Sequence, residues 1–413
     1  MRVALLTREY PPEIYGGAGV HVDHLSRELA RLVDLQIHCF GRPRGGGVQA
    51  YQPWSAFEAG GPEAAALAAM SVDLLMAQGV GGADLVHSHT WYTNLGGHLA
   101  KLLYAIPHVI TSHSLEPLRP WKAEQLGGGY ALSLFCERTA LEAADAVIAV
   151  SGAMRDDVLH AYPAVEPERV TVIHNGIDPD KYKPDLGTEA LERLGVDPAR
   201  PIVMFLGRVT RQKGVDHLLD AAVWIDPAAQ MLFCAGAADT PALGEEMRSR
   251  AADLGASRGG IVWVEEMLPR RDVVQLLSHA SVFVCPSTYE PFGLINLEAM
   301  ACEAAVVATA TGGIPEVVVD GETGWLVPLA VNPGGRPVDR MASPGTWPRG
   351  STTCSPTRRR LAASAGPAGG AWSSTSAGPP SQPRRPPCTA GSPAPVRPPP
   401  PGGRGVHPPR SMA

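Results

Sequence analysis

The sequence predicts an α/β protein with two domains, each built around a parallel β-sheet. Three features predict this fold class. Short apolar segments alternate with helical patterns along two successive parts of the chain, glycine-rich or polar turns follow the apolar segments, and the composition changes abruptly near residue 330. Strands and helices in alternation favour a parallel sheet, because the chain returns to the same sheet through right-handed crossovers. With 413 residues, the chain is long enough to form two full hydrophobic cores.

The composition is that of an ordinary globular protein, with 45% apolar residues and a net charge of −6. This near balance of charge does not suggest a nucleic-acid partner. The sequence has no run of about 18 or more apolar residues, so no membrane span is expected. Arg8 and Glu9 interrupt the first apolar run too early for a signal peptide. The seven cysteines include no C-x2-C pair, which argues against a zinc site or a disulfide framework. We therefore expect a cytoplasmic protein.

The first domain is expected over residues 1–174. Its first strand, residues 2–7, leads through a loop to Gly16 and Gly17, which precede an amphipathic helix. A strand, a glycine-rich turn and a helix together can present backbone N–H groups to a phosphate or a sugar; alternatively, the glycines serve a tight turn that needs positive φ. Further strands are expected at residues 35–40, 84–88, 108–112 and 146–150, and helices at about 62–78, 94–104 and 129–143.

Polar residues follow two of these strands, at the sheet edge where parallel sheets bind their ligands. His87 and His89 lie at the end of one strand, and His113 follows the next. Three histidines could ligate a metal ion, but no acid or cysteine at a suitable spacing accompanies them. Hydrogen-bonded histidines at strand ends are the simpler interpretation for His87 and His89. We therefore predict no metal site.

A long irregular stretch, residues 115–130, follows His113. It combines aromatic rings with charged side chains, a mixture that suits sugar binding, and long loops within compact domains tend to be functional. Together with Trp91, the following residues of this stretch are candidates for the acceptor side of a sugar site: Glu116, Arg119, Trp121, Lys122 and Tyr130.

A linker is expected over residues 175–200, and a second α/β domain over residues 201–329. The second domain opens with an apolar strand that runs into Arg208, and Lys213 follows just before a helix. Two cations at the carboxyl end of a strand, beside a helix N-terminus, form an anion site; a solvated pair of charges is the alternative. A helix is expected at residues 215–224, and strands are expected at 202–206, 231–235, 261–264, 282–284 and 323–327.

The most informative stretch of the second domain reads STYEPFGLINLEAM. Glu290 lies on a loop of this stretch, and Glu298 lies on a helix that begins near Gly293. Backbone N–H groups of Phe292, Gly293 and Leu294 are free to bind a phosphate at the helix N-terminus. The two carboxylates can accept hydrogen bonds from hydroxyl groups on either side of that phosphate. A nucleoside diphosphate sugar has this order of groups: hydroxyls, phosphates, hydroxyls.

With this stretch the sequence resembles the retaining glycosyltransferases of family GT4, which have the GT-B fold: two Rossmann-like domains that face each other across a cleft. Glu290 and Glu298 match the E-x7-E motif of the family. Gly312 begins a GGIPE motif, and His174 begins an HNGID turn like the one between the domains of the family. Residues 115–130 resemble the same run in actinobacterial glycogen synthases.

The resemblance covers about residues 1–329 and implies a role for each candidate residue, with His113 facing the sugar of the donor. One departure concerns the glycine loop, because bacterial glycogen synthases have a lysine two residues before the paired glycines, and Ile14 stands there in this sequence. The implied catalytic residues are His113, Glu290, Arg208 and Lys213; the implied donor-binding residues are Gly16, Gly17, Arg208, Lys213, Phe292, Gly293, Leu294 and Glu298; the implied acceptor-binding residues are Trp91, Glu116, Arg119, Trp121, Lys122 and Tyr130.

The implied reaction transfers glucose from ADP-glucose, without a cofactor, to the end of an α-1,4-glucan, as in glycogen synthases, or to glucose 1-phosphate, forming maltose 1-phosphate. No carboxylate pair at the short spacing of retaining glycosidases is evident, so a front-face substitution with the leaving phosphate as base is implied. Two alternatives stay open: a protein that binds a nucleotide sugar without turnover, and a GT-B sugar epimerase, in which the stretch at 115–130 has no acceptor to bind. The nucleotide (ADP or UDP), the acceptor and the oligomeric state stay open, and neither nucleic acid nor membrane is an expected partner.

From residue 330 to residue 413 the composition is dominated by proline, arginine, serine, alanine and glycine. This segment holds nineteen of the forty prolines and eleven arginines, but a single leucine and no isoleucine. It cannot bury a core and is expected to be disordered. GT-B enzymes normally end with helices that cross back onto the first domain, and none is readable here. A natural proline-rich tail and an out-of-frame reading of a GC-rich gene both account for the composition; we favour the second.

Overall fold

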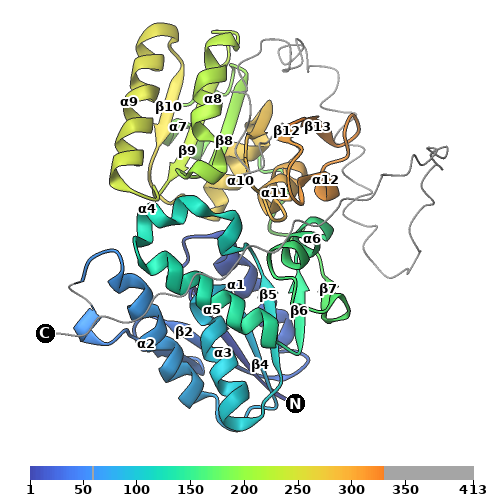
Figure 1. Ribbon diagram of the computed structural model, residues 1–413. Helices are drawn as coiled ribbons and strands as arrows, with labels where there is room; N and C mark the ends of the chain where they lie inside the picture. Colours follow the sequence, from blue (N-terminus) through green and yellow to red (C-terminus); the bar gives the residue numbers. More distant parts are fainter. Residues whose placement is uncertain (58–59, 330–413) are drawn as a thin grey trace, which may run out of the picture. The chain divides into compact units, whose positions relative to one another are not determined.

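The computed structural model describes residues 1–57 and 60–329, and the structural statements below concern these residues. They form two α/β domains, each with a parallel sheet (Figure 1). The first domain has a seven-stranded sheet with the strand order β3-β2-β1-β4-β5-β6-β7. Its strands are β1 (Arg2–Thr7), β2 (Asp34–Phe40), β3 (Val48–Tyr51), β4 (Leu85–His89), β5 (His108–Ser112), β6 (Ala146–Ala149) and β7 (Val170–Val172).

Helices α2, α3 and α5 pack side by side against one face of this sheet (Figure 1). The helix α1 contacts β1 and β2. The helices of this domain are α1 (Gly17–Leu29), α2 (Ala64–Gly79), α3 (Trp91–Tyr104), α4 (Ala123–Leu126), α5 (Gly129–Ala143) and α6 (Gly152–Ala161), with short 3-10 turns η1 (Ser55–Phe57), η2 (Glu116–Leu118), η3 (Pro120–Lys122) and η4 (Pro167–Arg169).

The second domain has a six-stranded sheet with the order β10-β9-β8-β11-β12-β13. Its strands are β8 (Ile202–Arg208), β9 (Gln230–Gly236), β10 (Ile261–Val264), β11 (Val282–Cys285), β12 (Ala305–Thr309) and β13 (Gly324–Val327). Its helices are α7 (Glu189–Leu194), α8 (Val215–Ala221), α9 (Pro241–Arg258), α10 (Arg270–His279), α11 (Leu294–Ala301) and α12 (Ile314–Val317), with 3-10 turns η5 (Arg211–Lys213) and η6 (Ala222–Trp224).

The central strands of both sheets are covered on both faces, which is why they appear in the sequence as continuous apolar runs. Leu5 and Leu6 of β1 and Met204 of β8 are fully buried. The pairings between the named strands are parallel. The carboxyl ends of the strands therefore meet at one edge of each sheet, which is the edge where ligands bind in such folds.

The prediction of two parallel-sheet α/β domains is confirmed. Sequence patterns did not reveal β3, β7 and β12. The strands β3 and β7 are edge strands of four and three residues, too short for a periodic pattern to stand out. The strand β12 follows the apolar helix α11 after a short connection, so that helix and strand form one apolar stretch in the sequence.

The stretch expected as a linker contains α7, which packs with the second domain. Ala190 and Leu191 of α7 are buried in the same apolar cluster as Ile202 and Phe283. The predicted disordered tail, residues 330–413, lies outside the described residues.

Apolar and polar contacts join the two domains. Phe292 of the second domain is buried in the same cluster as Ile110, Leu115 and Met154 of the first. Tyr289 packs against that cluster, and its hydroxyl oxygen accepts a hydrogen bond from the Leu115 N–H at 3.4 Å. The stretch around Phe292 is therefore part of the second domain in the chain, but its side chain packs in the core of the first domain.

The N-terminus of α6 provides the polar part of this contact. The Ser151 hydroxyl caps the helix by accepting from the Met154 N–H at 2.9 Å, and it donates to the Pro291 carbonyl at 2.7 Å. The carboxylate of Glu316 accepts hydrogen bonds from the N–H groups of Gly152 at 2.9 Å and Ala153 at 3.0 Å. A carboxylate at this position is also favoured by the positive end of the helix dipole.

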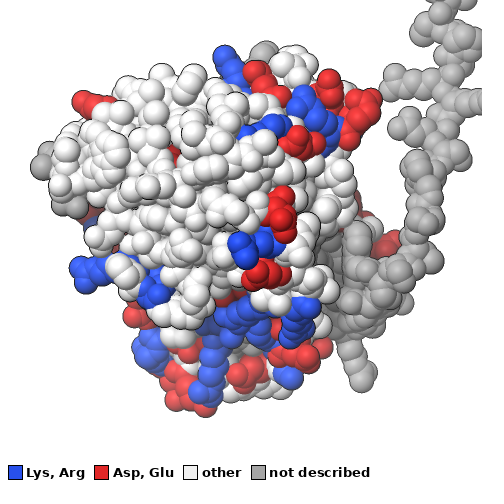
Figure 2. Space-filling model, turned by 90° about the horizontal axis from the view of Figure 1, so that it is seen from below, with Lys and Arg blue, Asp and Glu red and all other residues white. Residues whose placement is uncertain are grey.

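Figure 2 shows one face of the molecule, on which cationic and anionic side chains are interspersed beside a broad uncharged area. No continuous basic stripe crosses the part of the chain that is visible there. Among the described helices, none is long and apolar enough to cross a membrane.

Replacing Glu316 with Ala should lower the free energy of unfolding by about 0.5–1.5 kcal/mol, because two exposed backbone N–H groups of α6 exchange their carboxylate acceptor for water. The thermal midpoint should fall by a few degrees, as measured by circular dichroism. The matched control is Glu168→Ala, since Glu168 is an exposed acid on the 3-10 turn η4. Equal midpoints for the two variants would show that the Glu316 contact contributes nothing to stability.

Candidate functional site

The carboxyl ends of strands from both sheets border a shared cavity of about 1120 Å³. From the first domain, Arg8 follows β1 and His113 follows β5. From the second domain, Arg208 ends β8 and Glu290 follows β11. Because both domains contribute the edge that binds ligands in such sheets, this cavity is the candidate functional site.

Lys213 and Glu290, both predicted from the sequence, form an ion pair with Nζ and Oε2 2.7 Å apart. Glu290 is 7% exposed and also accepts a hydrogen bond from the Ser287 hydroxyl at 3.2 Å. Thr210 caps η5 by accepting from the Lys213 N–H at 3.1 Å, which orients the lysine. Burial lowers the pKa of Lys213, but the charge of Glu290, the neighbouring Cys285 and the hydrogen bond to Glu290 together outweigh burial and raise that pKa. Lys213 is therefore a charged ammonium group.

The loop that carries Glu290 depends on Gly312. The backbone of Gly312 has a φ of +51°, and a Cβ at this position would overlap the carbonyl oxygen of Glu290. The same carbonyl accepts a hydrogen bond from the Gly313 N–H at 2.9 Å. The glycine turn before α12 thus supports the loop that places the Glu290 carboxylate in the cavity.

Glu298 lines the cavity from α11, one and a half turns beyond Gly293, the N-cap of that helix. Phe292, Gly293 and Leu294 line it at the helix N-terminus. Burial raises the pKa of Glu298 to about 7, although a hydrogen bond from Tyr182 lowers it. Glu298 is therefore a mixture of carboxylate and carboxylic acid near neutral pH.

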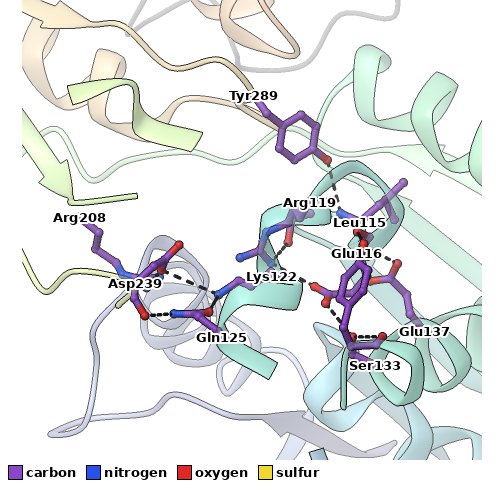
Figure 3. Close-up of polar contacts among 12 residues, drawn as sticks. Leu115, Glu116, Arg119, Lys122, Gln125, Ser133, Glu137, Arg208, Asp239 and Tyr289 are labelled. Atoms are coloured by element: carbon purple, nitrogen blue, oxygen red, sulfur yellow. Dashed lines mark hydrogen bonds and ion pairs between the residues drawn. The ribbon is translucent and has the colours of Figure 1, made fainter. Parts of the chain in front are cut away.

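A polar network crosses between the domains at Asp239, which follows β9 (Figure 3). Arg208 Nη2 donates to Asp239 Oδ1 at 2.5 Å, and Lys122 Nζ lies 3.9 Å from the same oxygen. Gln125 Nε2 donates to the Asp239 carbonyl at 2.6 Å, and Lys122 donates to the Gln125 side-chain oxygen. Burial, followed by the charge of Arg119, lowers the pKa of Lys122 to about 8. One carboxylate therefore compensates cations from both domains.

Glu116 supports this network from inside the first domain (Figure 3). It is 0% exposed, and its carboxylate accepts from the Ser133 hydroxyl at 2.9 Å and from Arg119 Nη1 at 3.3 Å. Its N–H donates to Glu137 at 2.8 Å, and the Tyr130 hydroxyl donates to its carbonyl at 2.6 Å. Burial and the nearby charge of Glu116 raise the pKa of Glu137. All polar groups of Glu116 are engaged, so this residue positions Arg119.

Several hydrogen-bond donors near this network have no partner. Among the described residues, Nε of Arg119, Nε of Arg208 and Nε1 of Trp121 are buried without a hydrogen bond. Buried polar atoms are normally satisfied, and each exception requires an explanation. All three atoms are donors, so a partner of any of them must supply an acceptor atom.

The carboxylate of Glu9 fixes the position of the glycine loop. One oxygen of this carboxylate accepts hydrogen bonds from the N–H groups of Tyr15 at 2.9 Å and Gly16 at 2.7 Å. Gly19 has no side chain because Glu9 passes where a Cβ would lie. Gly17 is the first residue of α1, so its N–H has no acceptor within the helix. Of the two predicted glycines, Gly17 is the one with a free amide.

Arg8 places a further cation in the cavity, stacked on aromatic rings. Its guanidinium carbon lies 3.8 Å from the centroid of the Tyr92 ring and 5.5 Å from that of Tyr15. The guanidinium of Arg208 lies 5.8 Å from the same Tyr15 ring. Cation–π contacts of this kind hold a guanidinium in a fixed position. The first domain thus has a cation near its glycine loop although Ile14 replaces the expected lysine.

His113 lies at the cavity wall with other histidines behind it. Its Nε2 is 3.0 Å from Nδ1 of His89, and its ring packs edge-on against His21 with centroids 4.7 Å apart. Burial lowers the pKa of His113 far below its usual value, so the ring is neutral. His87 Nε2 lies 2.7 Å from the Thr111 hydroxyl, in agreement with the prediction of a hydrogen-bonded histidine at a strand end.

Two sequence families match this chain. Residues 15–181 match Glycosyltransferase Family 4, and residues 188–333 match Glycosyl transferases group 1. Alpha-maltose-1-phosphate synthase of Mycolicibacterium smegmatis is 57% identical over 335 residues, which cover 80% of this chain and 86% of that protein. The chain belongs to glycosyltransferase family 4.

Further relatives of this family 4 glycosyltransferase agree with that assignment. D-inositol 3-phosphate glycosyltransferase of a Mycobacterium species is 34% identical over 246 residues, 59% of this chain and 55% of that protein. The structure of sucrose-phosphate synthase from Thermosynechococcus elongatus has a TM-score of 0.69 at 24% identity and covers 90% of this chain and 94% of that one. Anabaena Alr3699/HepE in complex with UDP and glucose has a TM-score of 0.67 at 21% identity, with coverages of 90% and 95%. These structures confirm the predicted GT-B fold.

The cavity of the glycosyltransferase brings most of the predicted site residues together, and their roles stay predictions. Among the predicted acceptor residues, Arg119 and Lys122 line the cavity, whereas Glu116, Trp121 and Tyr130 do not. Trp91 borders the cavity but is 2% exposed and packs in an apolar cluster. The predicted catalytic and donor-binding residues that line the cavity are His113, Gly16, Gly17, Arg208, Lys213, Glu290, Phe292, Gly293, Leu294 and Glu298.

Arg8, Gln125 and Asp239 are among the polar residues of the glycosyltransferase cavity that sequence reasoning missed. Arg8 and Asp239 follow strands of the two sheets, so the rule that ligands bind at carboxyl ends of strands could have identified them. Gln125 lies on the short helix α4, and no local signal distinguishes it from other polar residues of its loop.

Replacing Glu298 with Gln should raise the thermal midpoint more at pH 8 than at pH 5. The pKa of Glu298 is about 7 in the folded protein against 4.5 without burial, so its ionisation opposes folding. This destabilisation is absent below about pH 4.5, grows as the pH rises toward 7 and is complete above it.

Thermal midpoints of the unmodified protein and of Glu298→Gln, measured from pH 5 to pH 8, test this expectation. The matched control is Glu246→Gln, because Glu246 is exposed. Glu303→Gln is not suitable as a control, because Glu303 has a positive φ. If the thermal midpoints of Glu298→Gln and the unmodified protein differ by the same amount at every pH, the Glu298 carboxylate is not destabilised by burial.

Proposed function

We propose that this protein is a retaining glucosyltransferase that transfers glucose from ADP-glucose to glucose 1-phosphate and so forms maltose 1-phosphate. The observation that carries the proposal is that cations from both domains line the cavity; we assign those of one domain to each phosphorylated substrate. Arg208 and Lys213 come from the second domain, and Arg119 and Lys122 come from the first. The 57% identity to alpha-maltose-1-phosphate synthase supports this reaction, and the name D-inositol 3-phosphate glycosyltransferase also indicates a phosphorylated acceptor.

The donor binds mainly to the second domain in this proposal. Arg208, Lys213 and the amides at the N-terminus of α11 bind the diphosphate. Glu298 accepts hydrogen bonds from the ribose hydroxyls and Glu290 from those of glucose. In the free protein the Lys213 ammonium is bound by Glu290, so on donor binding it bridges this carboxylate and the diphosphate.

The chemical step replaces one bond to C1 of the donor glucose by another on the same face. The bond between C1 and the distal phosphate oxygen breaks, and the 4-hydroxyl oxygen of the acceptor forms the new bond to C1. The proton of that hydroxyl passes to the phosphate oxygen that leaves. Arg208 and Lys213 stabilise the negative charge that develops on the diphosphate, and His113 faces the glucose from the first domain. The step requires no metal ion, because these cations and the helix N-terminus supply the positive charge.

The acceptor phosphate binds between Arg119 and Lys122 in this proposal. The unpartnered Nε of Arg119, which lines the cavity, matches an acceptor oxygen of a phosphate. Lys122 has a pKa of about 8 because of burial and the charge of Arg119, and a bound phosphate dianion would favour its charged form. A neutral glucan has no group that uses these cations, which favours the sugar phosphate as acceptor.

Product analysis with radiolabelled ADP-glucose tests the proposed reaction. The protein is incubated with either glucose 1-phosphate or an α-1,4-glucan, in buffer with EDTA. We expect labelled maltose 1-phosphate with the first acceptor, at an undiminished rate in EDTA. Label in the glucan alone would establish glycogen synthase activity instead, and donor binding without any product would establish the non-catalytic alternative. Complete loss of transfer in EDTA with recovery on adding Mg²⁺ would contradict the metal-free mechanism.

Two lysine variants should separate the acceptor side from the donor side. Lys122→Met should raise the KM for glucose 1-phosphate about 10–100-fold, since a hydrogen bond to a charged group is worth roughly 1.5–3 kcal/mol, and should leave the KM for ADP-glucose nearly unchanged. Lys213→Ala should lower kcat/KM for ADP-glucose by about 10²-fold, as expected for one preorganised contact to developing charge. Steady-state kinetics with each substrate varied in turn give both values.

The matched control for these variants is Lys181→Met, since Lys181 pairs with Asp178 at the surface and does not line the cavity. If Lys122→Met changes the KM for the donor and not for the acceptor, the two groups of cations have been assigned to the wrong substrates.

A further inference from the structure

Three histidines from separate elements of the first domain converge behind the wall of the cavity. His21 lies on α1, His89 ends β4 and His113 follows β5. One ring nitrogen of each can be chosen so that the three atoms all lie within 4.8 Å of one another. The sequence offered His87, His89 and His113 as possible metal ligands, and in the structure His21 takes the place of His87 in this group. The spacing of histidines along the sequence could not reveal this cluster, because the fold brings α1, β4 and β5 together.

The cluster lacks the partners that buried imidazoles normally have. Nδ1 of His89 and Nε2 of His113 are 3.0 Å apart, while Nε2 of His89 is buried with no hydrogen-bond partner among the described residues. The neighbours that influence the charge of His89 and His113 are other histidines, and those of His21 are His24 and the neutral amide of Asn175. A neutral imidazole offers the lone pair of one ring nitrogen to a metal ion, and the three rings bring such nitrogens within 4.8 Å of one another.

We propose that His21, His89 and His113 form a binding site for a divalent transition-metal ion of the Zn²⁺ type, and that occupation of this site inhibits glucosyl transfer. Neutral imidazoles are preferred ligands of Zn²⁺, Co²⁺ and Cu²⁺. Nitrogens bound at about 2.0–2.1 Å to a tetrahedral ion lie roughly 3.3 Å apart, a spacing close to that of the His89–His113 pair. A rotation of the His21 side chain completes the set.

Three imidazoles leave the fourth position of a tetrahedral ion open, as in catalytic zinc sites. Because His113 lines the cavity, that position is expected to be reached from the cavity and to be filled by water or by a substrate oxygen. The ion would also fix the His113 ring and add two positive charges beside the proposed position of the donor glucose. The metal site itself does not depend on the proposed reaction; its inhibitory effect rests on it.

His21 provides the decisive variant, because it belongs to the cluster but not to the proposed catalytic machinery. The matched control is His24→Gln: His24 lies on the same helix one turn further and outside the cluster. The full chain without an affinity tag is freed of metal with EDTA and dialysed. Co²⁺ is then added as a spectroscopic probe, and Zn²⁺ binding is measured by calorimetry. Thermal midpoints verify that each variant is folded, and His21→Ala serves as a second variant if the glutamine destabilises α1.

The unmodified protein and His24→Gln should bind one Zn²⁺ per chain and give the visible absorption bands of four-coordinate Co²⁺. His21→Gln should lose these bands and bind Zn²⁺ more than about 100-fold more weakly, because loss of a direct ligand exceeds the 10–100-fold effect of an outer partner. Zn²⁺ should inhibit transfer by the unmodified protein and EDTA should restore it, whereas His21→Gln should retain transfer and resist Zn²⁺.

Absence of the Co²⁺ bands, or Zn²⁺ affinity that is equal in His21→Gln and His24→Gln, would overturn the metal site. Binding at this site without any effect on transfer would overturn the inhibition. If the protein transfers no glucose under any condition, the proposed function fails, while the Co²⁺ spectrum still decides whether the three histidines bind metal.

Discussion

The structure depends on the neutralisation of cationic side chains that two domains bring to one cavity. Cations that lie close together in a partly buried site repel each other, because the surrounding protein screens charge less well than water does. Lys122 shows this effect, since burial and the charge of Arg119 lower its pKa to about 8. Four of these cations are paired with acids: Lys213 with Glu290, Arg208 and Lys122 with Asp239, and Arg119 with Glu116.

These carboxylates place demands on the rest of the fold, because a buried charge is tolerated only with hydrogen bonds and a fixed position. Ser287 and the turn at Gly312 hold Glu290, and Ser133 holds Glu116. The same constraint joins the domains, since Asp239 of the second receives its contacts from Lys122 and Gln125 of the first. When a phosphate binds, it meets cations that have already lost much of their water. When these cations exchange a carboxylate partner for a phosphate, the cations need to lose little further water.

The histidine cluster shows the opposite response to burial. Cations at the cavity retain their charge because acids accompany them, whereas His21, His89 and His113 are surrounded by neutral groups and become neutral themselves. The cavity thus has a wall of fixed charges that suits phosphates and, beside it, a group of uncharged nitrogen ligands. Their proximity through His113 is the reason that a metal ion bound behind the wall would affect a reaction in front of it.

The sequence by itself determined the alternation of strands and helices, the position of Arg208 and Lys213 at the carboxyl end of a strand, and the carboxylate pair Glu290 and Glu298 beside a helix N-terminus. These features depend on neighbours within a few residues, and local periodicity and helix-end chemistry are readable at that range.

The tertiary structure decided which charges meet. Gln125 and Asp239 are 114 positions apart and touch across the domains, and Trp91 and Glu116, expected to face a sugar, are buried as packing and positioning residues. His21 joins His89 and His113 only because the fold brings His21 of α1 close to the residues at the carboxyl ends of β4 and β5. Such contacts follow from the packing of whole helices and sheets, which bury apolar surface wherever it lies in the chain, so no local pattern of residues records them.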